Sequence, residues 1–95
     1  MNIESIRHRA LRAYIETGNA KGIDVRLAGR IRNMVAFLLA ATDVHELHVP
    51  PNFGFHTLKG NRAGTFAMTV TKNWRMTFKV SAGDEIIDLD LEDYH

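Results

Sequence analysis

The sequence predicts one α+β domain over residues 1–95, in which an N-terminal helical hairpin packs on a small antiparallel β-sheet. Three observations predict this class. Apolar residues recur with a helical period of about 3.6 in the first part of the chain and with a strand period of about 2 after residue 64. Helices followed by a run of strands are typical of α+β domains. The length of 95 residues fits one domain, and no repeat or linker divides it.

The first helix is expected over residues 6–17. Ser5 stands where an N-cap residue accepts backbone N–H bonds, and Gly18 follows as a helix stop. Residues 2–5 have an alternative, because they also fit a short strand at the edge of the sheet. The apolar side chains of the helix are Ile6, Ala10, Leu11, Tyr14 and Ile15, and their spacing fits the helical period.

The second helix is expected over residues 25–40, with Asp24 as its N-cap. Its apolar side chains share one face at helical spacing, and that face is expected to pack on the sheet. These residues are Leu27, Ile31, Met34, Val35 and Leu38. A loop containing Pro50, Pro51 and Gly54 then ends the helical part of the chain.

Three strands are expected over residues 64–70, 73–80 and 85–92, joined by connections of hairpin length. Alternation assigns one set of side chains to the core. This set is Phe66, Met68, Val70, Trp74, Met76, Phe78, Val80, Ile87, Leu89 and Leu91. The alternate set faces away from the core and includes Arg75, Thr77, Lys79, Asp88, Asp90 and Glu92.

Composition excludes several classes of function. The chain has no cysteine, which excludes disulfides, thiolate nucleophiles, zinc ribbons and iron–sulfur clusters. It has no glycine-rich phosphate-binding loop either. The longest apolar run, residues 34–41, falls far short of the roughly 20 residues that span a bilayer, and charged residues interrupt the N-terminus where a signal peptide would be apolar. We therefore expect a cytoplasmic protein with no membrane association, no metal ion and no cofactor.

Charge is distributed unevenly along the chain. Residues 1–82 carry all 12 lysines and arginines against five acids, whereas residues 83–95 carry six acids and no lysine or arginine. A basic body favours a polyanionic partner, because each neutralised phosphate releases condensed counterions. The acidic strip has two interpretations: it is a solvated strand, or it repels nucleic acid from one face and so orients it.

A few polar residues have the chemistry of a catalytic site. His56 and Lys59 lie just before Gly60, where a short strand or a loop enters the sheet, and Arg75 and His95 follow later. Two imidazoles with lysine and arginine are the groups that RNA cleavage by its own 2′-hydroxyl uses. One group takes the 2′ proton, cations stabilise the phosphorane, and another group protonates the leaving 5′ oxygen. Imidazole suits both proton roles because its pKa lies at about 6.5.

Each of these residues also has a purely structural interpretation. His56 is then a solvated loop side chain, and Lys59 with Gly60 forms an ordinary turn. Arg75 is then the partner of a carboxylate across the sheet, an ion pair that contributes under about 1 kcal/mol when exposed.

Four motifs in this order resemble the HigB (plasmid-maintenance killer) family, which comprises RelE-superfamily toxins of type II toxin–antitoxin systems. They are residues 55–60 (FHTLKG), Gly64, residues 73–78 (NWRMTF) and the final Asp93-Tyr94-His95. The resemblance covers essentially the whole chain. One departure is the Pro-Pro-Asn-Phe-Gly stretch in residues 49–55, where many relatives have a shorter loop with a tryptophan.

The resemblance implies a ribosome-dependent mRNA endonuclease that cuts mRNA in the aminoacyl site through attack by the 2′-hydroxyl, without a metal. The matching active-site positions are His56, Lys59, Arg75, Asp93, Tyr94 and His95. His95 is the first candidate for proton transfer, and His56 is a second imidazole or a phosphate ligand; which of them is acid and which is base stays open. Lys59 and Arg75 would hold the scissile phosphate, while Asp93 would orient an imidazole. Tyr94 would stack on the substrate nucleotide or hydrogen-bond to it.

The resemblance also gives the basic surface a use. The residues expected to contact ribosomal RNA are Arg7, Arg9, Arg12, Arg26, Arg30, Arg62 and Lys79. The implied partner is a HigA-type helix-turn-helix antitoxin, and operator DNA would be bound only through the toxin–antitoxin complex. The alternative is a non-catalytic RelE-like binding module that acts only with its antitoxin.

Strict alternation along the last strand adds one structural expectation. It places Asp93 and His95 on the core side with Leu89 and Leu91. A polar site that uses the tail therefore requires the strand to end or to bulge near Glu92.

Overall fold

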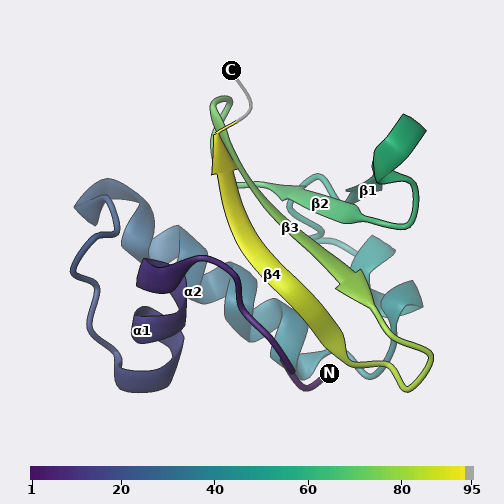
Figure 1. Cartoon of the computed structure of the whole chain (residues 1–95), viewed down its shortest axis with the longest axis horizontal. Coiled ribbons are helices and arrows are strands. Elements are labelled where there is room, and N and C mark those ends of the chain that lie inside the picture. Colours follow the sequence, from purple (N-terminus) through teal and green to yellow (C-terminus); the bar gives the residue numbers. More distant parts are fainter. Residues whose placement is uncertain (94–95) are drawn as a thin grey trace.

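The computed structural model describes residues 1–93 and shows two helices packed on one face of a four-stranded antiparallel sheet. The strand order is β1-β2-β3-β4, so every strand pairs with its neighbour in the chain. Helix α2 passes behind β3 and β4 in the view of Figure 1. The elements are α1 (Arg9–Thr17), α2 (Val25–Ala40), the 3-10 helix η1 (Val44–His48), β1 (His56–Thr57), the 3-10 helix η2 (Gly60–Arg62), β2 (Phe66–Thr69), β3 (Trp74–Val80) and β4 (Ile86–Asp93).

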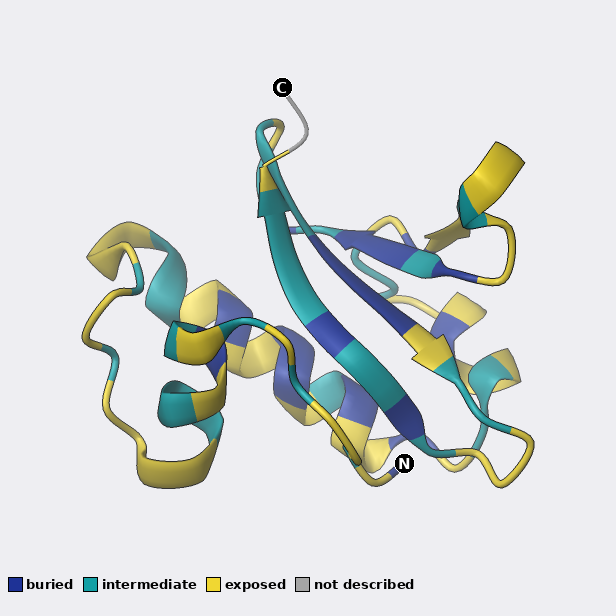
Figure 2. Ribbon diagram, viewed as in Figure 1, coloured by how far each residue is buried: buried dark blue, intermediate teal, exposed yellow. Residues whose placement is uncertain are grey.

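Helix α2 has the predicted bounds and the predicted cap. The carboxylate of Asp24 accepts the backbone N–H of Arg26 at 2.9 Å, which satisfies one of the amides that a helix start leaves without a partner. The buried side of the helix faces the sheet, as the dark blue segments of α2 in Figure 2 show. Its buried residues are Ile31, Met34, Val35 and Leu38.

Helix α1 begins at Arg9, so the prediction that Ser5 caps a helix starting at residue 6 is wrong. His8 is the cap, and its Nδ1 accepts the backbone N–H of Leu11 at 3.1 Å. The Ser5 hydroxyl instead accepts the backbone N–H of Asp88 at 2.8 Å. The alternative of an edge strand therefore describes this segment better than a helix does.

The N-terminal segment pairs with the outer edge of β4 through isolated parallel bridges. Ile3 stands opposite Ile86, and Ile6 stands opposite Leu89. Two backbone bonds of 2.7 Å, from the N–H groups of Glu4 and Arg7 to carbonyls of β4, support the pairing. The edge of β4 is thereby covered along these residues.

Strands β2, β3 and β4 lie within one or two residues of the predicted positions, but a bulge changes the pattern in β4. The register passes from Thr77 opposite Asp90 to Lys79 opposite Ile87, so β4 contains one extra residue there. Asp88 adopts a left-handed φ of 55° at this point. As a result Ile86 is fully buried, whereas the predicted core residue Ile87 is only partly buried.

The bulge of β4 lies at Asp88 rather than near Glu92, and β4 runs to Asp93, the last described residue. The requirement that the strand end near Glu92 for the tail to reach a polar site therefore stays a prediction. Beyond the bulge, alternation again holds, with Leu89 buried on the helix side. Glu92 therefore lies on the opposite face. We call that face, which is directed away from α2, the open face of the sheet.

Candidate active site

The open face carries a row of polar side chains from neighbouring strands. Arg75 of β3 stands directly opposite Glu92 of β4, and Thr77 stands opposite Asp90. Residues paired in this way have their side chains on the same face, whereas Met76 between them is directed into the core. The sequence-based placement of Arg75 and Thr77 away from the apolar core face is confirmed.

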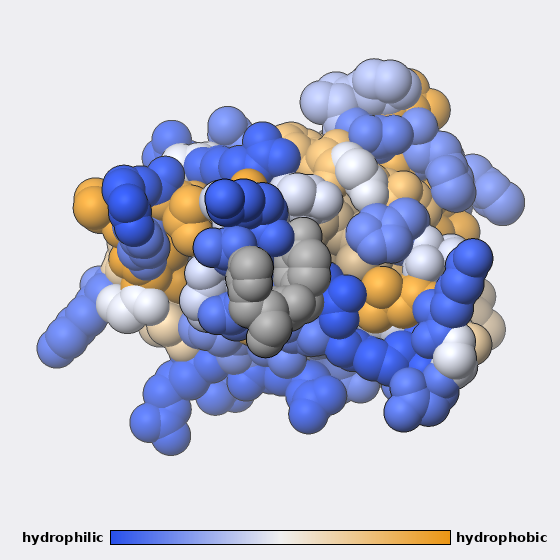
Figure 3. Space-filling view, turned by 90° about the horizontal axis from the view of Figure 1, so that it is seen from above, coloured by the Kyte–Doolittle hydropathy of each residue, from blue (hydrophilic) through white to orange (hydrophobic). Residues whose placement is uncertain are grey.

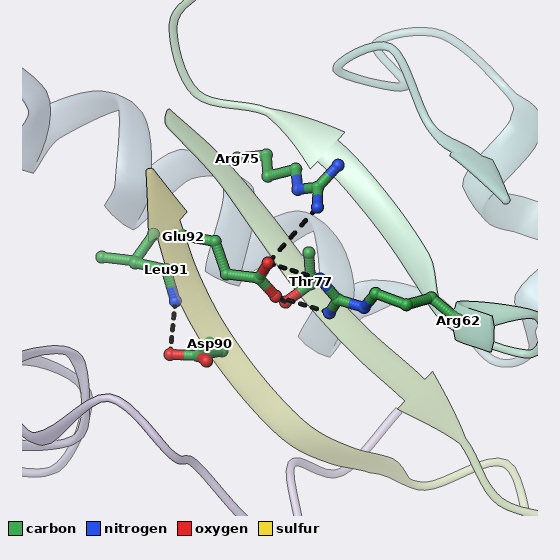
Figure 4. A network of polar contacts seen from close by, with 6 residues as sticks. All are labelled: Arg62, Arg75, Thr77, Asp90, Leu91 and Glu92. Atoms are coloured by element: carbon green, nitrogen blue, oxygen red, sulfur yellow. Dashed lines mark hydrogen bonds and ion pairs between the residues drawn. The ribbon is translucent and has the colours of Figure 1, made fainter. Parts of the chain in front are cut away.

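The carboxylate of Glu92 lies at the centre of a network of four side chains (Figure 4). Arg62, from η2, reaches across the open face and donates from Nη1 and Nη2 to the two carboxylate oxygens at 2.6 and 2.7 Å. The hydroxyl of Thr77 donates to the same carboxylate. Nη2 of Arg75 lies 3.4 Å from Oε1. Both oxygens of Glu92 are therefore occupied by donors.

This network shifts the pKa values of its members. The hydrogen bonds from Arg62 are the main cause that lowers the pKa of Glu92 to about 2, and the Thr77 and Arg75 contacts add to them against the opposing effect of partial burial. The pairing with Glu92 raises the pKa of Arg62. Glu92 is therefore ionised at neutral pH, and the two arginines and one carboxylate carry a net charge of +1.

A hollow of about 30 Å³ adjoins the network on the open face. Three of the predicted RNA contacts, Arg7, Arg62 and Lys79, line it together with three acids, Asp88, Asp90 and Glu92. The hollow therefore brings cations from the N-terminal segment, η2 and β3 to one place. It is too small for a nucleotide, so any substrate would lie over the open face rather than inside the sheet.

His56 and Lys59 lie at the β1 end of the same face. His56 pairs with Ala67 of β2, which in turn pairs with Thr77, so these three positions share the open face. Nδ1 of the exposed His56 lies 2.8 Å from the carbonyl oxygen of Gly54. When Nδ1 donates this bond, Nε2 is left as the acceptor nitrogen of the neutral ring. Exposed Lys59 is the cap residue of η2, the same short turn that carries Arg62.

The tail is only partly described. Asp93, the last residue of β4, is exposed and stands opposite Trp74, which puts it on the helix side of the sheet rather than on the open face. Tyr94 and His95, both predicted active-site residues, lie outside the described residues. Among the predicted catalytic residues that are described, the open face thus carries Arg75 and His56, while Lys59 lies in the turn between β1 and η2.

Of the remaining predicted RNA contacts, Arg26 and Arg30 make contacts within the chain. Arg26 forms a 2.8 Å ion pair with Asp24, and its side-chain hydrogen bond is the main cause that lowers the pKa of Asp24 to about 2. Arg30 donates to the carbonyl oxygen of Thr69 at 2.9 Å, and its guanidinium lies 5.1 Å from the ring centre of Phe53. Arg9 and Arg12 are exposed on α1.

Residues 1–93 contain neither a cluster of metal-binding side chains nor a membrane-spanning helix. No three histidine, aspartate or glutamate side chains of this part of the chain are grouped so that they could hold a metal ion. No helix in it has the length and apolar character needed to cross a bilayer.

Comparison with known proteins identifies the family. The profile of a family described as "RelE-like toxin of type II toxin-antitoxin system HigB" matches residues 4–95. The chain belongs to this family. The predicted resemblance is thereby confirmed, and the chain is the toxin of a type II toxin–antitoxin pair, which implies an antitoxin as its partner.

Individual relatives agree with this assignment of a HigB-like toxin. The chain is 37% identical over 93 residues to the Endoribonuclease HigB of Proteus vulgaris, a match that covers 98% of this chain and 99% of the relative. In fold it is similar to YafQ from Escherichia coli strain BL21(DE3), with a TM-score of 0.62 at 12% identity, covering 98% of this chain and 94% of YafQ. It is also similar to a YoeB/ParE toxin from Agrobacterium tumefaciens, with a TM-score of 0.57 at 17% identity, covering 100% and 99% of the two chains. The last two matches support the predicted α+β, RelE-like fold.

Glu92 is the residue of this HigB-like site that sequence reasoning missed. It was assigned only to the side of β4 that faces away from the core, in an acidic strip thought to be solvated or repulsive. Its contact with Arg75 was anticipated as a pairing across the sheet, but its two-point contact with Arg62 was not. Finding that contact requires the register of β3 with β4 and the position of η2, and neither is encoded in a local motif.

Proposed function

We propose that this HigB-like toxin is an endoribonuclease that cuts mRNA in the ribosomal aminoacyl site, with the 2′-hydroxyl of the RNA as the attacking group. The observation that carries the proposal is the open face of the sheet, which holds Arg75 and, in the neighbouring cross-strand row of Ala67 and Thr77, the exposed imidazole of His56. The relative in Proteus vulgaris named Endoribonuclease HigB supports the reaction class.

The phosphate would be held by Arg75 and Lys59. When the 2′ oxygen attacks phosphorus, negative charge grows on the equatorial oxygens of the phosphorane, and donors already in place stabilise it. Arg75 is suited to this role because its side chain is only 21% exposed, which strengthens its interaction with an anion relative to bulk water. Lys59 would add a second, mobile charge from the η2 turn.

Two proton transfers complete the reaction. One group removes the 2′ proton as the oxygen–phosphorus bond forms, and another donates a proton to the 5′ oxygen as its bond to phosphorus breaks. The products are a 2′,3′-cyclic phosphate and a 5′-hydroxyl. His95 and His56 are proposed for these roles, with Asp93 orienting an imidazole and Tyr94 contacting the substrate nucleotide. No metal ion or cofactor is required by this chemistry.

Binding to the ribosome would use exposed cations around the open face and on the helices. Arg7 and Lys79 at the hollow, together with Arg9 and Arg12, are proposed to contact RNA phosphates, which makes binding sensitive to salt. Arg26 and Arg30 are also proposed to contact RNA phosphates, while Arg26 stays paired with Asp24 and Arg30 stays bound to the carbonyl oxygen of Thr69. We also propose that the toxin is cytoplasmic and that its partner is a HigA-type helix-turn-helix antitoxin. The toxin would be bound to operator DNA only through its complex with this antitoxin.

The test is a cell-free translation reaction with a defined mRNA, purified toxin and the Arg75→Ala variant. We expect the wild type to cut mRNA only when ribosomes are present, leaving a 2′,3′-cyclic phosphate, and Arg75→Ala to be slower by roughly 10²-fold. Lys72→Ala, which removes an exposed cation from the turn before β3, is the matched control and should cut like the wild type.

Two outcomes would contradict the proposal. Cleavage of naked RNA at the same rate would mean a ribonuclease that does not need the ribosome. No cleavage by a folded wild-type protein would refute the catalytic proposal and favour a non-catalytic module that acts with its antitoxin.

A further inference from the structure

Arg62 makes a two-point contact with a carboxylate on the open face. Its two terminal nitrogens both bind Glu92, at 2.6 and 2.7 Å, in a two-point contact that fixes the carboxylate in direction as well as in charge. Its side chain is 39% exposed, but the two nitrogens it would offer to an RNA phosphate are already engaged. A surface arginine that binds a phosphate would have at least one terminal nitrogen without a bond to a carboxylate, and Arg62 has both of them bound to Glu92.

Arg75 is bound to the same carboxylate in a different way. Its Nη2 lies 3.4 Å from Oε1 of Glu92, which is longer than the roughly 2.7–2.9 Å of a close charge-assisted hydrogen bond. Figure 4 shows the two guanidinium groups approaching the carboxylate from different sides. Most of the hydrogen bonding of Glu92 with arginine is therefore directed to Arg62 and little of it to Arg75.

We propose that Arg62 is a positioning residue that holds Glu92 in a two-point contact and so prevents Glu92 from forming a close ion pair with Arg75, the phosphate-binding arginine. The proposal rests on the function proposed above, because it assigns Arg75 to the scissile phosphate. Arg62 then acts through Glu92 and Arg75 and need not touch the substrate.

The charge balance explains why Arg62 matters. With Arg62 present, the charge of the carboxylate is neutralised mainly by Arg62, and Glu92 competes only weakly for Arg75. Without Arg62, Glu92 and Arg75 would form a neutral pair with both side chains only 21% exposed, where an ion pair is stronger than in bulk water. A substrate phosphate would then have to displace an attached carboxylate. Because Glu92 is ionised at neutral pH, its carboxylate would compete with the substrate phosphate for Arg75 throughout the neutral pH range.

The same contact fixes the turn that carries Lys59. Arg62 and Lys59 flank η2, and the backbone N–H of Arg62 lies 3.4 Å from the carbonyl oxygen of Lys59. The side chain of Arg62 is anchored on β4 through Glu92. Loss of Arg62 would therefore loosen this turn as well, and the experiment has to separate that effect from the effect on Arg75.

The experiment is a double-mutant cycle with Arg62→Met, Glu92→Gln and the double variant, measured as single-turnover mRNA cleavage on saturating ribosomes. We expect Arg62→Met to lower the cleavage rate by roughly 10²-fold, the cost of losing one preorganised charge donor. Adding Glu92→Gln should restore the rate to within about 10-fold of the wild type, because the competing carboxylate is gone. The ribosome concentration at half-saturation should not change, since Arg62 acts on catalysis and not on attachment.

Two results would overturn the proposal. If the double variant is as slow as Arg62→Met, then Arg62 acts by holding the Lys59 turn or by touching RNA directly. If the half-saturating ribosome concentration rises while the maximal rate stays constant, Arg62 is a ribosome contact, as the sequence predicted. Lys21→Met, which removes one exposed cation from the segment between the helices, controls for the lost charge. Thermal unfolding checks that all variants are folded at the assay temperature.

A second measurement does not depend on activity. In ¹⁵N-labelled protein, a close two-point pairing with a carboxylate slows rotation of an arginine guanidinium, so the Nη signals of Arg75 report its contact with Glu92. We expect slower rotation in Arg62→Met and a return toward wild-type rotation in the double variant. Equal rotation in all proteins would refute the positioning role even if the wild type proved unable to cut mRNA. Absence of cleavage by the wild type would refute the proposed function alone.

Discussion

Replacing Glu92 by glutamine should change how the stability of the protein depends on pH. The pKa of Glu92 is lowered from 4.5 to about 2, and since one pKa unit corresponds to about 1.36 kcal/mol, the shift corresponds to at most roughly 3 kcal/mol of stability at neutral pH. A group with a lowered pKa contributes stability above its unfolded-state pKa and loses it as the pH falls toward the folded-state value. The stabilisation should therefore be complete above about pH 5.5 and decline as the solution is acidified.

The magnitude follows from the two pKa values. Between pH 6 and pH 3 the wild type should lose about 2 kcal/mol of the contribution of Glu92, or nearer 1 kcal/mol when partial exposure of the network is taken into account. Glutamine has no charge to lose, so the variant should lack this component. All other carboxylates titrate in both proteins, and the difference between the two curves isolates Glu92.

The assay is urea unfolding of both proteins at pH 6, 5, 4 and 3. We expect wild type to be the more stable protein at pH 6 and the difference in free energy of unfolding to shrink steadily toward pH 3. Parallel curves, with a constant difference, would refute the reasoning, because they would show that the ionised carboxylate of Glu92 is not specifically stabilised in the folded state.

Three further predictions concern other parts of the chain. Lys59→Ala should abolish growth arrest on expression of the toxin while leaving the melting temperature nearly unchanged; a large drop in melting temperature would instead make Lys59 structural. Phe78→Ala should lower the free energy of unfolding by about 3–5 kcal/mol in denaturant titrations, because it opens a cavity at a fully buried position. Ser5→Ala should cost about 0.5–1.5 kcal/mol and raise amide exchange at Asp88, whose N–H it leaves without the hydroxyl acceptor. Unchanged exchange at Asp88 would contradict the assigned contact.

The parts of the fold that local chemistry determines were predicted well. Helix α2 combines a side-chain cap at Asp24 with a clear apolar face, and its bounds match the prediction. Strand β3 alternates regularly, which placed Arg75 and Thr77 away from the apolar core face. Both predictions depend only on residues within a few positions of one another.

The parts that were missed depend on contacts between distant residues. Ser5 has the chemistry of a helix cap, but its hydroxyl is bound to a residue 83 positions away. The bulge at Asp88 uses a left-handed backbone at a residue other than glycine, which alternation alone does not indicate. The role of Glu92 was missed for the same reason, because Arg62 meets it only after the sheet has formed.

The pairing of the N-terminal segment with β4 has a consequence for self-association. An uncovered strand edge presents unpaired N–H and C=O groups on which another chain can add a strand. Here residues 3–6 occupy that edge, and their contact with β4 closes most of the chain into one loop, which carries an entropic cost of closure. Until it closes, β4 remains a template for a second copy of the chain. By covering this edge, the N-terminal segment prevents strands of other molecules from pairing with β4.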